Sequence, residues 1–375
     1  MIGTTITARL LCNARAALGR TALGLTYWIA RFAGLMSGIP TRFIGASAGV
    51  SSARVDQVRS MAGQRGKQTT LRRPVTVSGI GVHSGNDVSL TLNPAEANHG
   101  VVFCLTGRET KAERTIPATY RHVSATDLCT AVGIAGASVA TIEHLMAALS
   151  ALEVDNVLVE IDGDEVPVMD GSACAFIDAI DEAGVSILDA PTRYLKILKP
   201  VRVEIGQSFA EFEPHNGRRV EVEIDFASPL IGRQHYAFDV DQTSFRSDIA
   251  RARTFGFLAD VEALWAKGFA RGASLENAVV LGEDRVMNPE GLRFADEFVR
   301  HKVLDAVGDL ALAGMPIIGC YRSYRGGHKL NVKAVEALIA DTRAWTVIEG
   351  PARRESTHAG AAPAIAAAAY GPDAT

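Results

Sequence analysis

The spacing of apolar and polar positions predicts β-strands in the first part of the folded chain. Residues 69–78, 88–92 and 100–105 carry β-branched and apolar side chains between polar breaks, a pattern typical of strands. A glycine-rich turn at residues 79–85 lies between the first two of these stretches. The folded chain is therefore expected to open near Gln68 as a β-rich segment.

The first clear helix is predicted to begin near Thr141. Apolar side chains recur there at the i, i+3, i+4 and i+7 spacing of one helical face. They are Ile142, Leu145, Met146, Leu149 and Leu152. A strand at residues 156–161, a loop at 165–172 and a second helix at 173–182 are expected to follow. Together with the opening strands, these elements predict an α+β domain at residues 68–189.

The second half of the chain repeats this order of strands and helices. Strands are expected at residues 194–204, 210–213 and 219–225. The strongest helical pattern covers residues 297–313, and Gly314 and Pro316 beyond it are typical stop signals. Because strands lead into a helix with one histidine in both halves, we expect a second, related α+β domain at residues 190–342.

The composition is that of a soluble globular protein. Of the 375 residues, 47% are hydrophobic and 21% are charged, and the formal net charge is −4. Such a chain has no general attraction to nucleic acid, so an anionic substrate would need a local basic site. The five cysteines show no C-x-x-C spacing, which argues against a disulfide framework or a thiolate zinc cluster and favours a reducing compartment.

The two ends of the chain differ from the rest. Residues 1–67 form a basic extension whose first 55 residues contain six arginines and no acidic residue, as in a transit peptide. This extension is interpreted as a targeting segment, a membrane-surface helix at residues 23–36, or an addition of little consequence. Arg31 and Arg42 interrupt its apolar stretches, so no transmembrane helix is expected. The Ala-rich end, residues 343–375, is predicted to be a disordered tail.

One helix carries a stripe of residues that could hold a metal ion. His301, Asp305 and Asp309 follow one another at steps of four and therefore share one side of the helix at residues 297–313. Such a polar stripe is normally a solvated face. A histidine and a carboxylate at i and i+4 can, however, converge on one metal ion. A third ligand would then have to come from another element.

The helix near Thr141 offers that ligand in the dipeptide Glu143-His144. A histidine at a helix start is often only a structural residue. Combined with His301 and Asp305, however, His144 would complete a three-ligand site with an open fourth position, as in catalytic zinc centres. Glu143, beside a ligand but not needed as one, would be placed to take a proton from a water molecule there.

A glycine pair offers a second acid–base group. Gly326 and Gly327 permit a close backbone approach that could deliver His328 into a cleft, although the segment also fits an ordinary turn. A charged His328 could protonate a leaving amine, and Asp309 could hold its ring by a hydrogen bond. Other mechanisms lack support, since the sequence from Gln68 onward has no G-x-S-x-G elbow, and the chain has no Walker-type loop or complete G-x-G-x-x-G motif.

Seven motifs, in chain order, resemble those of the UDP-3-O-acyl-N-acetylglucosamine deacetylases of lipid A biosynthesis. They include SGIGVHSG, TIEHL and VRHKVLD, and they lie at residues 78–85, 141–145, 167–172, 252–257, 291–294, 299–305 and 326–328. The resemblance covers residues 68–341. It implies two α+β domains whose helices are sandwiched between two outer sheets, with the active site at the domain junction.

The resemblance also implies a cofactor and the main catalytic groups. One zinc ion per chain would be bound by His144, His301 and Asp305. Glu143 would act as the general base, and His328 as the general acid or as an electrostatic partner. Iron in place of zinc stays open, because this ligand set accepts other divalent ions.

Further residues match family positions that support catalysis or contact the substrate. Thr254 matches a position whose hydroxyl stabilises the oxyanion. Lys302 and Phe255 match substrate-contacting positions. Residues 257–281 match an insert that forms an apolar passage for the acyl chain.

The expected reaction is removal of the N-acetyl group from UDP-3-O-acyl-N-acetylglucosamine. The alternatives are a non-catalytic nucleotide-sugar or lipid-binding protein of the same fold, and a zinc hydrolase of another acylated amine. We expect a bacterial cytoplasmic monomer that can touch the membrane surface, binds no nucleic acid and has no transmembrane segment. An organelle-targeted form is the alternative for localisation.

Overall fold

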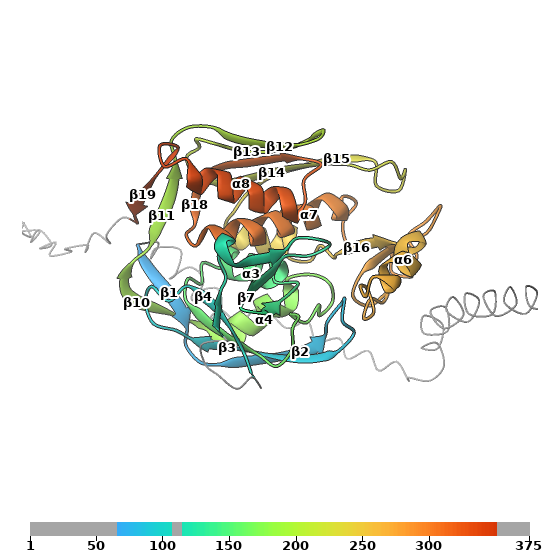
Figure 1. Ribbon diagram of the computed structural model, residues 1–375, viewed down its shortest axis with the longest axis horizontal. Coiled ribbons are helices and arrows are strands. Elements are labelled where there is room, and N and C mark those ends of the chain that lie inside the picture. Colours follow the sequence, from blue (N-terminus) through green and yellow to red (C-terminus); the bar gives the residue numbers. More distant parts are fainter. Residues whose placement is uncertain (1–65, 107–114, 351–375) are drawn as a thin grey trace, which may run out of the picture.

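The main helices of the protein lie between two outer β-sheets (Figure 1). The computed structural model describes residues 66–106 and 115–350. Helices α3 (Glu143–Ala151) and α4 (Cys174–Ala183) belong to the half with the first sheet, and α7 (Glu297–Leu310) and α8 (His328–Ala340) pack on the second. Because α3 packs against α7, the two halves meet through their helices. The predicted α+β class, with helices between outer sheets, is confirmed.

The first sheet has the strand order β2-β3-β9-β4-β5. Its strands are β2 (Val75–Ile80), β3 (Asp87–Pro94), β9 (Val157–Ile161), β4 (Val101–Leu105) and β5 (Thr115–Pro117). Neighbours run antiparallel except β9 and β4, which are parallel. In β3, Val88, Leu90 and Leu92 are buried and alternate with more exposed residues. One face of the sheet therefore packs into the hydrophobic core.

The stretch predicted as one strand at residues 69–78 forms two strands in different sheets. Strand β1 (Lys67–Leu71) pairs antiparallel with β10 (Val185–Pro191), whereas β2 belongs to the first sheet. Between them the N–H of Arg72 donates to the carbonyl of Gly184, and Pro74 has no N–H to continue a ladder. The chain changes sheets at this point, although its apolar pattern continues.

A small antiparallel sheet in the first half was not predicted. It consists of β6 (Val123–Ala125), β7 (Ala131–Ile134) and β8 (Ala137–Val139), and it follows the short 3-10 helix η2 (Tyr120–His122). These strands have only three or four residues each, which is too short for a clear alternation of apolar positions.

The second sheet has the order β12-β13-β18-β11-β19, with β14 beside β18 and β15 beside β14. Its strands are β11 (Arg193–Ile197), β12 (Val201–Ile205), β13 (Ser208–Glu213), β14 (Arg218–Asp225), β15 (Arg233–Asp239), β18 (Ile317–Tyr324) and β19 (Trp345–Glu349). The expected strand at residues 194–204 is split into β11 and β12 by a break at residues 198–200, which ends in Pro200.

Strand β19 lies inside the segment expected to be a disordered tail. It pairs antiparallel with β11, so regular structure continues beyond the boundary predicted at residue 342. Pairing with a strand some 150 residues earlier in the chain leaves no local signal in the sequence. The rest of the tail, residues 351–375, lies outside the described residues, as do residues 1–65 of the basic extension.

The central helix of the second half matches the predicted helix at residues 297–313. Helix α7 continues into the 3-10 turn η5 (Ala311–Ala313), and Gly314 ends it with a φ of 79°. Gly308 faces the start of α3, where a β-carbon on it would lie 2.8 Å from the carbonyl carbon of Glu143. Only a residue without a side chain lets α7 and α3 approach so closely at this point.

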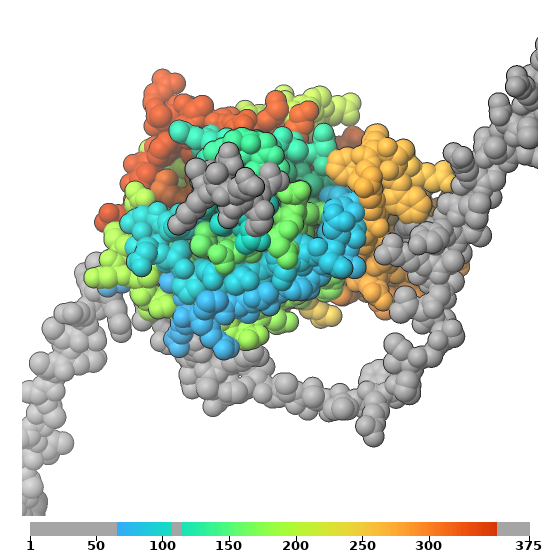
Figure 2. Space-filling model, turned by 60° about the horizontal axis from the view of Figure 1, so that its bottom comes forward, coloured from blue at the N-terminus to red at the C-terminus, as the bar shows by residue number. Residues whose placement is uncertain are grey.

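A segment of the second half protrudes beside the layered body (Figures 1 and 2). It contains β16 (Phe255–Phe257), η4 (Leu258–Asp260), α6 (Val261–Ala266) and β17 (Val279–Leu281). It follows α5 (Gln242–Ser244) and the π-helical turn η3 (Phe245–Ile249). No residue of α6 is buried. Within the described residues, no helix is both long and apolar enough to cross a membrane.

Candidate active site

Three helices bring the predicted catalytic residues together. Helix α3 begins at Glu143 and His144, while α8 begins at His328. His301 and Asp305 lie on α7, and Asp309 is one further turn along it. All six side chains are buried, so the polar stripe on α7 is not a solvated face. It instead faces the junction between the two halves of the chain.

His144, His301 and Asp305 form a compact group that could hold a metal ion. One ligand atom from each lies within 4.8 Å of the other two. Asp305 Oδ1 is 3.3 Å from His301 Nε2 and 3.7 Å from His144 Nε2. The two imidazole planes are nearly perpendicular, with centroids 5.0 Å apart. The ring nitrogens and the carboxylate therefore converge on a common point.

The hydrogen bonds of these residues fit a metal ion. Asp305 Oδ1 is buried and has no hydrogen-bond partner within the described part of the chain. An unpaired buried carboxylate oxygen costs several kcal/mol of stability, roughly the full desolvation penalty of the group. His301 Nδ1–H donates to the carbonyl of Ala252 at 3.1 Å, which leaves the Nε2 lone pair free to bind a cation.

The protonation states also suit metal binding. Burial lowers the pKa of His144 to about 3, helped by the neighbouring His301. Burial likewise lowers the pKa of His301. Burial alone would raise the pKa of Asp305, but His301 and Lys302 outweigh it and hold the pKa below its usual range. Two neutral imidazoles and one carboxylate are the forms in which these side chains bind metals.

An acid–base pair lies beside this group. Glu143 Oε1 is 3.9 Å from His328 Nε2, and His328 Nδ1–H donates to Asp309 Oδ2 at 2.9 Å. Burial raises the pKa of Glu143 to about 7. Burial lowers the pKa of His328, but the carboxylates of Asp309 and Glu143 raise it to about 9. At neutral pH the carboxyl can therefore accept a proton while the imidazolium can give one.

The predicted substrate-contacting residues lie against the same group. Lys302 Nζ donates to Asp305 Oδ2 at 2.7 Å and is 5.6 Å from the centre of the Phe255 ring. The ring of Phe255 is 6.3 Å from that of His301. Thr254 precedes Phe255, and its N–H donates to the carbonyl of Gly171. All nine residues singled out in the sequence thus belong to this junction or to the segment bordering it.

Three residues of the site were missed by sequence reasoning. Thr130 donates hydrogen bonds to Glu143 and Asp309, Asn331 donates to Asp309, and the carbonyl of Ala252 orients His301. A lone threonine carries no motif, so nothing in the sequence marked Thr130. Ala252 begins the motif at residues 252–257, but a role for its backbone carbonyl leaves no trace in the choice of side chain. Asn331 lay within the glycine-containing segment around His328, but it stands out only once α8 is known.

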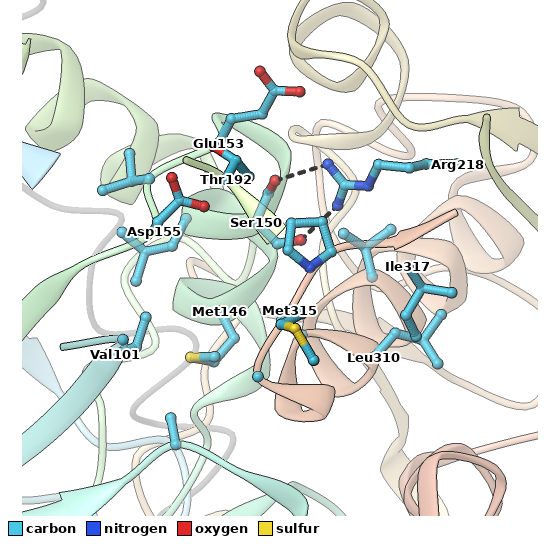
Figure 3. A pocket seen from close by; sticks show the side chains of 18 of the residues that line it. Val101, Met146, Ser150, Glu153, Asp155, Thr192, Arg218, Leu310, Met315 and Ile317 are labelled. Carbon is cyan, nitrogen blue, oxygen red and sulfur yellow. Dashed lines mark hydrogen bonds between the residues drawn. The ribbon is translucent and has the colours of Figure 1, made fainter. Parts of the chain in front are cut away.

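A separate cavity lies at the other end of α3 and contains none of the predicted site residues. It has a volume of about 300 Å³, and Figure 3 shows Met146 and Leu310 among the residues that line it. Arg218 reaches across it and donates to the carbonyl and the hydroxyl of Ser150, the latter at 2.8 Å. Its guanidinium is thus engaged with the end of α3, away from the converging ligands.

Two imidazoles, a carboxylate and an adjacent pair of proton-transfer groups at a buried junction are the groups that hydrolases with a single metal ion use. The family model of UDP-3-O-acyl N-acetylglycosamine deacetylase (LpxC) matches residues 68–340. The UDP-3-O-acyl-N-acetylglucosamine deacetylases of Brucella ovis and Brucella abortus are each 55% identical over 283 residues, which cover 75% of this chain and 98% of the relative. That of Brucella melitensis is 54% identical over the same length. The chain belongs to this deacetylase family.

Proposed function

We propose that this protein hydrolyses the N-acetyl group of UDP-3-O-acyl-N-acetylglucosamine. The products are acetate and the free amine UDP-3-O-acyl-glucosamine. This reaction would be an early committed step of lipid A biosynthesis. Membership of the deacetylase family supports the substrate. The observation that carries the chemistry is Asp305 Oδ1, a buried and unpaired oxygen that faces two imidazole Nε2 atoms. A catalytic metal ion bound between these atoms would give this carboxylate oxygen its missing partner.

His144, His301 and Asp305 would hold one zinc ion. Two neutral nitrogens and one carboxylate oxygen, with a fourth position left for water, are the ligands of catalytic zinc sites. When bound, the ion would polarise the acetyl carbonyl and increase the acidity of a water molecule. Zinc is proposed because the resemblance to the deacetylase family implies it. Two histidines and one carboxylate also suit ferrous iron, and metal analysis of the purified protein distinguishes the two ions.

Glu143 and His328 would manage the protons of the reaction. Glu143 accepts a proton from the attacking water through Oε1, because Oε2 is held by the N–H of Thr130. A carbon–oxygen bond forms at the acetyl carbon, and the carbon–nitrogen bond then breaks. His328 donates its Nε2 proton to the departing nitrogen while Asp309 holds Nδ1. Thr254 would donate a hydrogen bond to the oxyanion.

The residues beside this centre would position the substrate. Lys302 supplies a positive charge close to the reacting carbonyl, and Phe255 supplies an apolar wall. Residues 257–281, which form most of the protruding segment, would line the path of the acyl chain.

The same proposal extends to domains and location. Residues 68–189 and 190–342 would act as two domains with the active site between them, the second lengthened by β19 to residue 349. In support, every strand of the first sheet comes before residue 190 and every strand of the second sheet comes after it. The enzyme would work as a monomer in the bacterial cytoplasm and meet its acylated substrate at the membrane surface.

The deciding experiment is deacetylation of the acylated UDP-sugar by purified protein before and after metal stripping. We expect activity to vanish on stripping and to return with about one equivalent of zinc. Equal turnover of simple N-acetyl sugars would instead indicate a hydrolase of other acylated amines. Substrate binding without turnover by the metal-loaded protein would indicate a binding protein and would refute the proposal.

A further inference from the structure

Thr130 connects the proposed base and the partner of the proposed acid. This side chain is fully buried, immediately before β7, in a part of the chain that matches none of the motifs identified above. Its N–H donates to Glu143 Oε2 at 3.0 Å, and its hydroxyl donates to Asp309 Oδ1 at 2.6 Å. Its carbonyl accepts from the N–H of Ile142, the residue before Glu143. Every polar group of Thr130 therefore contacts the acid–base machinery or the start of α3.

The hydroxyl of Thr130 completes the hydrogen bonds of Asp309. Asp309 Oδ2 accepts from His328 Nδ1 at 2.9 Å and from Asn331 Nδ2 at 2.8 Å. Asn331 in turn accepts from the hydroxyl of Tyr321 at 2.6 Å. The opposite oxygen, Oδ1, accepts from Thr130. Donors on both sides hold the carboxylate plane, and this plane sets the direction of the His328 ring.

The bond also crosses between the two halves of the chain. Thr130 belongs to the first half, whereas Asp309 lies on α7 of the second. The same residue holds Glu143 Oε2 through its backbone, which leaves Oε1 turned toward His328 Nε2 at 3.9 Å. One residue thus sets both the base oxygen that is free to react and the orientation of the acid opposite it.

We propose that Thr130 is a positioning residue that aligns His328 with Glu143 by fixing Asp309 through its hydroxyl. The proposal rests on the proposed deacetylase function. Thr130 touches neither substrate nor metal ligands in this assignment, so its effect falls on proton delivery rather than on binding. Loss of the hydroxyl leaves Asp309 Oδ1 unpaired and lets the carboxylate rotate, and the His328 ring rotates with it.

The test compares Thr130→Val with Thr130→Ser in the full-length, zinc-loaded protein. Valine keeps the branched shape and the N–H bond to Glu143 but removes the hydroxyl, whereas serine retains it. For Val we expect kcat to fall about 10- to 100-fold, the usual effect of losing such an outer contact, with KM and zinc content nearly unchanged. For Ser, kcat stays within about threefold of wild type. Equal kcat values for Val and wild type would overturn the proposal.

A matched control separates positioning from general loss of a buried hydroxyl. Thr70 is also buried, and its hydroxyl donates to the carbonyl of Asn156 at 2.7 Å and accepts from the N–H of Ala95 at 2.8 Å, remote from the active site. Thr70→Val is expected to lower the melting temperature without changing kcat per folded molecule. If Thr130→Val behaves in the same way, its role is only structural. If Thr130→Val is insoluble, Thr130→Ala takes its place, since the smaller side chain cannot clash.

A double-mutant cycle tests whether the effect passes through the general acid. In a His328→Ala background, Thr130→Val should lower kcat by less than about threefold, because there is no ring left to align. The same fold-loss in both backgrounds would show that Thr130 acts independently of His328, contrary to the proposal.

A spectroscopic measurement tests the positioning role of Thr130 without requiring enzyme activity. The ring N–H resonance of His328, identified by its loss in His328→Ala, should shift in Thr130→Val but not in Thr130→Ser or Thr70→Val. This shift is measurable even if the wild-type protein fails to turn over the acylated UDP-sugar, which would refute the proposed function alone. An unshifted resonance in Thr130→Val would refute the positioning role.

Discussion

Adding one methyl group at Gly308 should both destabilise the protein and inactivate it. A β-carbon there would lie 2.8 Å from the carbonyl carbon of Glu143, and closer still to its oxygen. Carbon atoms in contact prefer about 3.5 to 4.0 Å, so α7 and α3 must separate by at least about 0.7 Å. In an open helix, Gly→Ala would instead stabilise by about 1 kcal/mol. A decrease or an increase in the free energy of unfolding therefore tells whether α7 and α3 are in close contact at Gly308.

We expect Gly308→Ala to lower the free energy of unfolding by about 1 to 3 kcal/mol, the usual cost of overpacking. The shift also displaces Glu143 relative to Asp305 and Asp309, and a misplacement of about 1 Å can cost about 100-fold in rate. Urea unfolding and kcat of the folded fraction measure the two effects. Gly256→Ala, whose β-carbon would meet no atom within 4 Å, is the control for stability. A Gly308→Ala protein as stable and active as wild type would refute the reasoning.

Four further predictions follow from the contacts above. Glu143→Gln should lower kcat by about 100- to 10,000-fold, as expected for a lost general base, with zinc content unchanged; a loss of only a few fold would exclude that role. Glu297→Gln should cost about 1.5 to 3 kcal/mol in urea unfolding, because it removes the buried charge partner of Arg253 at 2.9 Å while Glu290 stays paired with the same guanidinium; a cost below about 0.5 kcal/mol would contradict it. Removing zinc should lower the melting temperature by leaving Asp305 Oδ1 unpaired, and an unchanged melting temperature would count against the metal site. Burial raises the pKa of Asp155 from 3.8 to about 6, so the folded state binds this proton more tightly than the unfolded state. Its contribution to stability is present below about pH 4 and is lost as the pH rises through about 6, so Asp155→Asn should weaken the fall in stability over this range.

Local patterns in the sequence determined much of the helical framework. The apolar period after Thr141 and the pattern at residues 297–313 each predict a helix that the structure contains. The i, i+4 spacing of His301 and Asp305 predicts that they share one helix face, because helix geometry depends only on sequence separation. The division into two α+β halves also follows from the order of local patterns, and the α+β class is confirmed.

The sequence also determined which residue types could do chemistry, but their roles stay predictions. The motifs around Glu143, His301 and His328 indicated the deacetylase family, which the comparisons confirm. The measurements proposed above test whether each side chain binds the metal ion or transfers a proton. A resemblance in sequence identifies the residues, whereas activity identifies what they do.

Only the tertiary structure decided whether the polar stripe on α7 is buried. A helix with His301, Asp305 and Asp309 on one side has the same sequence pattern whether that side meets water or another helix. Gly308 lets α7 contact α3 closely, and this contact buries the three side chains at the junction of the two halves. Burial then produces the altered pKa values of Glu143 and His328.

Long-range pairing likewise lay beyond the sequence. Strand β19 pairs with β11, and one apolar stretch divides between β1 and β2, because strand partners are chosen across the whole fold. The bond from Thr130 to Asp309 joins residues 179 positions apart. Local periodicity reports only which face of an element is apolar, whereas contacts between distant elements depend on how those faces meet. The sequence therefore determined the elements and the reactive residues, and the packing of α3 on α7 decided their arrangement into a site.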